Sequence, residues 1–211
     1  MKKIFLLFCL LCISVTTVMA QDTTNWTRLV RPDSKTVAVI LDFPVEFINN
    51  SKMNTMVMNK VQTTFAKPDY YIVPMEKAQI AKDNYCDEHG IPKFVNQYDM
   101  NPTLTSYDLK TLGKNLQADY QADYVYYISF TAGAVQQASG MFNSSSATVG
   151  NCGVKVLDMH TGKYIYQKTV TAEGKSTSWL SNEYAPKKAY YHAIENCLKK
   201  IVIDPKTLGN A

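Results

Sequence analysis

The sequence has little net charge and only one long apolar run, and each shortage excludes a class of protein. Its 22 basic and 18 acidic residues leave a formal net charge of +4, far from the clustered basic character of a nucleic-acid-binding protein. After residue 20 no apolar run approaches the roughly 20 residues that a transmembrane helix needs. We therefore expect no nucleic-acid partner and no transmembrane segment in the mature chain.

The common catalytic and cofactor-binding motifs are also missing. The chain has no phosphate-binding loop of the form G-x-x-x-x-G-K-[ST], no H-E-x-x-H helix and no G-x-S-x-G elbow. Its only C-x-x-C pair, Cys9 and Cys12, lies inside the N-terminal apolar run. These absences predict a protein that is not an enzyme and that binds no cofactor or metal.

The first twenty residues have the pattern of a signal peptide. A positive start (Lys2, Lys3) precedes an apolar core over 4–15, and the segment ends in small residues at Ala20. The core is shorter than a membrane span, which favours cleavage over a retained anchor. Neither of its two cysteines follows the small residues that lipoprotein processing requires. We predict an exported protein, periplasmic or associated with the outer membrane, without a lipid anchor.

The rest of the chain has the length of one domain. Cleavage leaves 191 residues (211 − 20), which is ample for one hydrophobic core and short for two. We expect an irregular arm over 21–34, a single domain over 35–204 and a C-terminal tail over 205–211.

The clearest change of periodicity lies at 112–130. Apolar residues recur at helical spacing up to Leu116, and from Tyr124 to Phe130 they recur at every second position. Val125 and Tyr127 make the other face of this strand apolar as well. We therefore predict a central strand that is covered on both faces.

Upstream of this strand, the pattern predicts a βαβ unit. A continuous apolar run over 36–43 is a buried strand, and residues from Met53 to Phe65 repeat at helical spacing. A short strand over 69–74 follows. Two strands joined in this way by a helix are expected to be parallel, with a right-handed crossover.

Between this unit and the central strand we expect a short helix and a long loop. The helix covers 75–83, and the polar stretch over 84–103 shows no periodicity. Thr105 and Asp108 have the spacing of a capping box, which predicts the start of the next helix.

The C-terminal part is predicted to form an antiparallel hairpin followed by a helix. Strands are predicted over 151–158 and 164–172, joined by a tight turn with Gly162 at the position that requires positive φ. A helix over 185–203 closes the chain. The fold class is therefore α/β: a single domain with a mixed sheet of about five strands and helices packed on it.

Three cysteines remain after the signal peptide. Cys152 lies on an apolar strand face and Cys197 on an apolar helix stripe, so both are expected in one core. Two alternatives are open: a disulfide between them, or two buried thiols that only lie near each other. Cys86 has no obvious partner.

The candidate binding residues are tyrosines, and a second candidate site lies in the polar loop. Tyr184, Tyr190 and Tyr191 near the last helix are candidates for partner binding, because exposed tyrosine is favoured at protein contacts. The alternative is that they only cover the sheet. The segment from Cys86 to His89 is the densest set of ligand-type side chains, but four neighbouring loop residues rarely form a tetrahedral metal site.

Several short phrases occur in an order that is typical of one family. They are VAVILDF (37–43), YIVP (71–74), LG (112–113), ADYV (122–125) and VKVLD with TGK (154–163). In these phrases the chain resembles, over about 36–202, the family that includes the amino-terminal domain of TolB, CsgG and LpoB. Many members are outer-membrane lipoproteins, and this chain departs from them in lacking the lipidation cysteine.

The resemblance implies a mixed sheet with packed helices in a cell-envelope protein that binds or scaffolds other proteins. We therefore predict a non-enzymatic, exported accessory protein with a protein partner in the bacterial envelope. Two alternatives remain open. One is an exported hydrolase with a site near Cys86 to His89, and the other is a self-assembling structural subunit, a homo-oligomer.

We expect the exported protein to begin at Gln21. Mass spectrometry of the protein purified from the envelope fraction should find Gln21 as the first residue. The variant Ala20→Phe should be cleaved more slowly, because signal peptidase needs a small residue before the cut. A wild-type envelope form that still begins at Met1 would contradict the prediction.

Overall fold

The structure is a computed structural model that describes residues 34–48, 50–65, 69–96, 101–139, 143–179 and 185–204. The predicted signal peptide, nearly all of the arm and the C-terminal tail lie outside these residues, as does Tyr184. None of the helices in the described ranges has the length and apolarity to cross a membrane.

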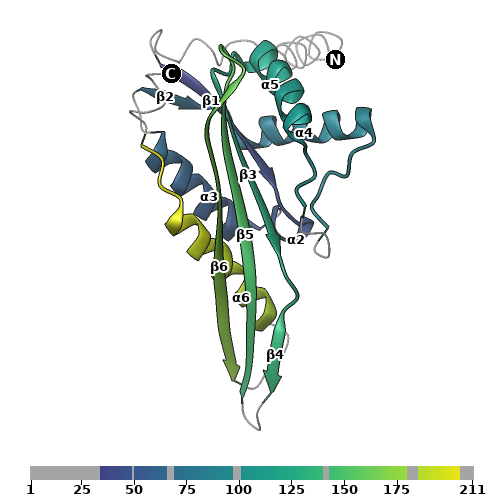
Figure 1. The fold of residues 1–211 in the computed structure, drawn as a ribbon, viewed down its shortest axis with the longest axis vertical. Coiled ribbons are helices and arrows are strands. Elements are labelled where there is room, and N and C mark those ends of the chain that lie inside the picture. The colour runs from purple at the N-terminus through teal and green to yellow at the C-terminus, as the bar shows by residue number, and fades with distance from the viewer. Residues whose placement is uncertain are drawn as a thin grey trace, which may run out of the picture. The chain divides into compact units, whose positions relative to one another are not determined.

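The described chain from Lys35 onward forms one six-stranded mixed sheet (Figure 1). Its order is β2-β1-β3-β5, with β4 beside the first part of β5 and β6 along the other edge of β5. β1 is parallel to β2 and β3, and the other pairs are antiparallel. The strands are β1 (Lys35–Asp42), β2 (Tyr70–Ile72), β3 (Tyr124–Ala132), β4 (Gln136–Ser139), β5 (Asn143–Asp158) and β6 (Lys163–Trp179).

Helices cover both faces of the sheet, which confirms the predicted α/β class with its βαβ unit, central strand and hairpin. α3 and α6 pack on the face that carries Tyr126 and Phe130, and α4 and α5 lie on the other face (Figure 1). All nine residues of β3 are buried, as expected for a central strand. The helices are α2 (Val45–Ile48), α3 (Ser51–Thr64), α4 (Met75–His89), α5 (Ser106–Tyr120) and α6 (Ala185–Lys200).

Local signals set the helix starts. Asn50 caps α3, since its side chain accepts a hydrogen bond from the Met53 amide at 3.2 Å. The capping box predicted at α5 is confirmed: Thr105 Oγ1 accepts from the Asp108 amide, and Asp108 accepts from the Thr105 amide at 2.9 Å. These bonds satisfy amide groups that have no partner inside the helix.

α4 corrects the prediction of a loop over 84–103. The helix continues to His89 and ends at Gly90, whose φ of 65° is left-handed. Ala78, Lys82, Tyr85 and Cys86 are its buried residues. Their spacing is helical, but the charge of Lys82 interrupts the apolar pattern, so the sequence does not indicate a buried stripe here.

The hairpin is longer than predicted at its open end. β5 begins at Asn143 rather than 151, and β6 continues to Trp179 rather than 172. The burial alternates along this part of β5, but the buried positions hold Ser144, Ser146 and Thr148, which carry no apolar signal. At the closed end, Gly162 has a φ of 66°, as the tight turn requires.

α6 lies directly against the backbone of the hairpin because small residues meet there. A Cβ atom added to Gly174 would collide with two backbone atoms of α6, the Ala189 carbonyl oxygen and the Ala193 amide nitrogen. The predicted stripe of Ala189, Ala193 and Cys197 is completely buried.

Polar side chains of α6 also bond to the outer edge of β6. They stand four residues apart on the helix, and the carbonyl groups that they contact stand two residues apart on the strand. The contacts are His192 Nδ1 to Lys175 O (2.5 Å), Asn196 Nδ2 to Glu173 O (2.9 Å) and Lys200 Nζ to Thr171 O (2.7 Å). This polar ladder hinders another chain from pairing with the β6 edge.

Gly174→Ala should strongly destabilise the fold. The added methyl group meets helix backbone, which cannot move aside as a flexible side chain can, so we expect a loss of about 3 kcal/mol or more. Urea unfolding followed by circular dichroism measures the change. Gly133→Ala is the control, because its Cβ would find only the Val149 carbonyl at 3.8 Å. Equal unfolding midpoints for the two variants would refute this account of the packing.

Candidate functional site

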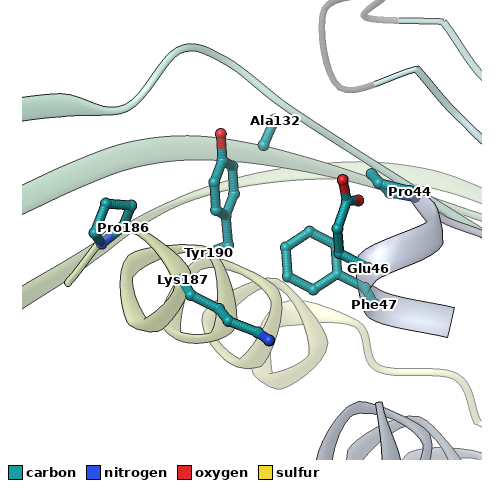
Figure 2. Close-up of a pocket in the computed structure, with 7 residues that line it drawn as sticks. All are labelled: Pro44, Glu46, Phe47, Ala132, Pro186, Lys187 and Tyr190. Carbon is teal, nitrogen blue, oxygen red and sulfur yellow. The ribbon is translucent and has the colours of Figure 1, made fainter. Parts of the chain in front are cut away.

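A small pocket lies where α2, the end of β3 and the first turn of α6 meet (Figure 2). Its volume is about 240 Å³. We call it the Tyr190 pocket, and its lining residues are Pro44, Glu46, Phe47, Ala132, Pro186, Lys187 and Tyr190.

Backbone geometry and aromatic packing hold the pocket in shape. Pro44 follows β1, and its carbonyl accepts a hydrogen bond from the Phe47 amide at 2.9 Å, which starts the α2 turn. The Phe47 ring is buried and packs edge-on against Tyr190 at 5.5 Å and Tyr191 at 5.7 Å. Such edge-to-face pairs are favourable beyond their buried area. The Tyr190 ring is therefore fixed against a buried neighbour.

The pocket has apolar walls and opposite charges at its border. Glu46 and Lys187 are exposed, and Figure 2 shows them on either side of the Phe47 ring. Among the described residues, the lining includes no histidine or cysteine, and the Tyr190 phenol is its only hydroxyl. This set of groups suits the binding of an apolar side chain better than acid–base chemistry.

The three candidate tyrosines have different positions. Tyr190 is half-buried and lines the pocket. Tyr191 belongs to the core, with 9% of its surface exposed, and the Lys52 ammonium lies 5.6 Å from its ring centre. Tyr184 is outside the described residues. Their role in partner binding stays a prediction. Of the two described tyrosines, Tyr190 is the one that lines the pocket.

Cys152 and Cys197 belong to the same core cluster, as the sequence suggested. Both thiols are free and buried, and Cys197 Sγ donates to the Gly150 carbonyl at 3.5 Å. Burial raises the pKa of Cys152 well above its ordinary value, and the neighbouring Cys197 raises this pKa further. A disulfide between them in the exported protein remains a prediction.

The segment from Cys86 to His89 lies on α4 and not in a loop. Cys86 is buried, and burial raises the pKa of its thiol, which opposes formation of a nucleophilic thiolate. The His89 ring stacks on Tyr85 at 4.1 Å. Within the described ranges, no group of three or more ligand-type side chains is placed to hold a metal ion.

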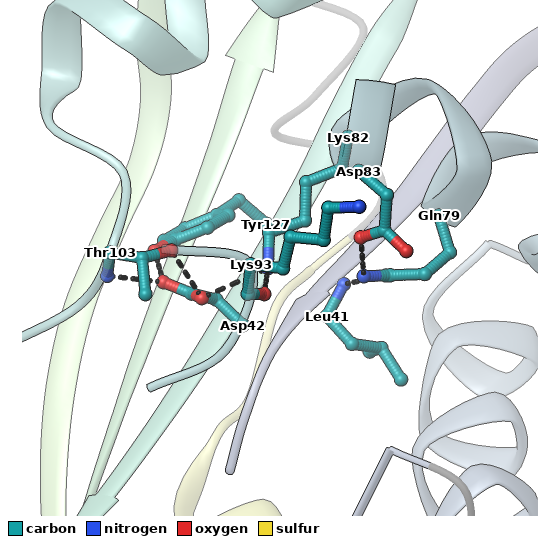
Figure 3. A network of polar contacts seen from close by, with 8 residues as sticks. All are labelled: Leu41, Asp42, Gln79, Lys82, Asp83, Lys93, Thr103 and Tyr127. Atoms are coloured by element: carbon teal, nitrogen blue, oxygen red, sulfur yellow. Dashed lines mark hydrogen bonds and ion pairs between the residues drawn. The ribbon is translucent and has the colours of Figure 1, made fainter. Parts of the chain in front are cut away.

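A buried network of polar contacts surrounds Asp42, at the end of β1 (Figure 3). Its carboxylate lies 3.1 Å from Lys82 Nζ, and neither side chain is exposed to solvent. It also accepts bonds from the Tyr127 hydroxyl at 2.5 Å and from the Thr103 amide and hydroxyl at 2.7 and 2.6 Å. Lys82 donates further to the Lys93 carbonyl at 2.5 Å. The network joins two strands, α4 and both ends of the segment between α4 and α5.

No motif in the sequence predicts this network. Its signal was a single acidic residue, Asp42, at the end of an otherwise apolar buried strand. A carboxylate in that position needs donors from other elements. Lys82 and Tyr127 supply them from 40 and 85 residues further along the chain.

Comparisons with known proteins give structural neighbours only. No protein family and no curated protein matches the sequence. A lipoprotein, GNA1162 from Neisseria meningitidis, is similar with 12% identity and a TM-score of 0.37, covering 79% of this chain and 99% of that chain. The LpoB C-terminal domain from Salmonella enterica is similar with 11% identity and a TM-score of 0.34, covering 66% and 83%.

A third neighbour is a putative neuraminyllactose-binding hemagglutinin homolog from Helicobacter pylori. It is similar with 8% identity and a TM-score of 0.39, covering 85% of this chain and 90% of that chain. The neighbours thus include LpoB and a bacterial lipoprotein, and the resemblance to TolB and CsgG stays a prediction.

Lys82→Met should destabilise the protein because it leaves the Asp42 carboxylate buried without its counter-ion. Breaking a buried ion pair by removing one partner costs about 3 to 5 kcal/mol. The free energy of unfolding in urea at pH 7 measures the loss. The control is Lys93→Met, which removes an exposed pair with Asp87 but keeps the Lys93 carbonyl. This control should unfold close to the wild-type midpoint, and an equal effect of both variants would contradict the assignment.

Proposed function

We propose that this chain is an exported, non-enzymatic accessory protein that binds another protein of the bacterial cell envelope. In this proposal the Tyr190 pocket holds an apolar anchor side chain of the partner. The observation that carries the proposal is a small, apolar-walled and preformed pocket with an aromatic residue fixed at its side.

The lining of the pocket favours an apolar side chain of a protein partner. The pocket measures about 240 Å³ and has apolar walls. A cavity of this size suits one large side chain of a partner. Protein interfaces depend on a few such buried anchors, and tyrosine is enriched among the residues that bind them.

The surroundings of the pocket also fit a protein contact. Val45, an apolar residue between the lining residues Pro44 and Glu46 in the chain, begins α2 with 42% of its surface exposed. Glu46 and Lys187 offer charges of both signs at the border, where complementary charges of a partner add specificity more than affinity. Export and the envelope setting rest on the predicted signal peptide and on the sequence resemblance.

The hydrolase alternative has less support, because its proposed nucleophile, Cys86, is buried in the packing of α4. The self-assembly alternative is treated as an outcome of the test that follows.

Tyr190→Ala should weaken partner binding by roughly 30-fold, because truncating an anchor residue costs about 2 kcal/mol. The partner is first captured in cells by a photo-crosslinking amino acid at position 187 and identified by mass spectrometry. Its affinity for the purified mature protein is then measured by calorimetry. Tyr190→Phe keeps the ring and should bind almost normally.

The matched control is Tyr107→Ala, on α5 across the sheet, where the tyrosine is 77% exposed. It should bind as the wild type does. Normal binding by a folded Tyr190→Ala variant would overturn the assignment of the pocket. Capture of no chain except a second copy of this protein would replace the accessory function with self-assembly.

A further inference from the structure

The sheet face opposite α6 has a hollow centred on Gly153. Three neighbouring strands, β3, β5 and β6, place their residues side by side there. The rows are Tyr127–Lys155–Gln167, Ser129–Gly153–Thr169 and Thr131–Asn151–Thr171. The central position has no side chain of its own, so the Ser129 hydroxyl reaches over it, 2.8 Å from where a Cβ atom on Gly153 would lie.

The hollow has a volume of about 220 Å³ and a polar lining. Among the described residues the lining includes two lysines, Lys155 and Lys168, and no carboxylate. Lys168 pairs with Val154 of the opposite face, so Lys155 is the cation on the face of the hollow. Pro102 forms part of its wall. Neutral hydrogen-bonding groups form much of the rest of the lining, namely the hydroxyls of Ser129, Thr131 and Thr169 and the amides of Asn151 and Gln167, and Tyr127 and Val154 also line it.

Lys155 is a partly desolvated cation that no described carboxylate balances. Its ammonium donates to Ser106 Oγ at 3.2 Å and lies 5.6 Å from the ring centre of Tyr164. Burial lowers the pKa of this group. Within the described ranges it forms no ion pair, and Asp42, which bonds to the neighbouring Tyr127, is already paired with Lys82. An anion that entered the hollow would stabilise the charged lysine.

We infer that the Gly153 hollow binds a carboxylate group carried by a polar molecule, with Lys155 as its counter-ion. Neutral hydroxyl and amide groups around one partly buried ammonium suit a single negative charge. Phosphate sites usually add an arginine fork, and no arginine is among the described residues that line the hollow. The hydroxyls and amides of the lining match the hydroxyl or peptide groups of the molecule that bears the carboxylate.

The carboxylate has two sources, a small polyhydroxy acid or the free C-terminus of a polypeptide, and two probe pairs distinguish them. Gluconate is compared with glucitol, which has the hydroxyl groups without the charge. N-acetyl-trialanine with a free carboxylate is compared with its C-terminal amide. Each is titrated into the mature protein, and the amide signals of Gly153 and Thr169 are followed by NMR.

We expect at least one acid to shift these signals with a saturable curve, and its uncharged counterpart to leave them unchanged. Lys155→Gln should weaken that binding about tenfold or more, because hydrogen bonds to charged groups are among the stronger ones. Lys110→Gln is the control, since Lys110 lies over the same Tyr164 ring at 5.7 Å but does not line the hollow.

Binding of gluconate would identify a small acid, and binding of the peptide acid alone would identify a polypeptide terminus. The inference is overturned if neither acid shifts the signals, if the uncharged probes bind equally well, or if folded Lys155→Gln binds as the wild type does. The hollow and the Tyr190 pocket lie on opposite faces of the sheet. Tyr190→Ala should therefore leave carboxylate binding unchanged, which keeps the two proposals separately testable.

Discussion

The burial of one charge, on Asp42, constrains how the elements around the end of β1 can meet. A carboxylate taken out of water is strongly unfavourable unless ion pairing and hydrogen bonds replace its hydration. Here the replacements come from Lys82 on α4, Tyr127 on β3 and Thr103 ahead of α5. These elements are distant in the sequence, so the charge is satisfied only when all of them are in place. Arrangements that lack any of these groups leave the charge poorly compensated, which favours the observed one.

The parts of the fold that could be predicted are those where burial and hydrophobicity coincide. β1, β3 and α3 bury apolar residues at regular spacing, and the capping box at Thr105 marks a helix start by its chemistry. The longer hairpin could not be predicted, because its buried positions hold Ser144, Ser146 and Thr148. The extension of α4 could not be predicted for the same reason: Lys82 is fully buried, although a lysine in the sequence indicates an exposed position.

The candidate sites differ in how far local sequence could reveal them. Tyr190 was accessible to sequence reasoning, because tyrosines cluster near a helix and such residues often bind partners. The position of Tyr191 in the core depends on the rotation of α6 and on its contact with Phe47, which are tertiary facts. The hollow at Gly153 depends on the register of three strands. No local pattern indicates that this glycine lies between Ser129 and Thr169.

The ladder between α6 and the edge of β6 joins two structures whose repeats differ slightly. Four residues along a helix advance about 6.0 Å, and two residues along a strand advance about 6.8 Å. Each successive contact of the ladder, or rung, is therefore displaced by about 0.8 Å more from its strand carbonyl. After three rungs the accumulated offset is about 1.6 Å, and a fourth would be about 2.4 Å out of step, too far for a good hydrogen bond. The third rung uses Lys200, the last residue of α6. The difference between the two repeats therefore limits the length over which α6 can shield the edge. A longer helix would shield no more of the edge in this way.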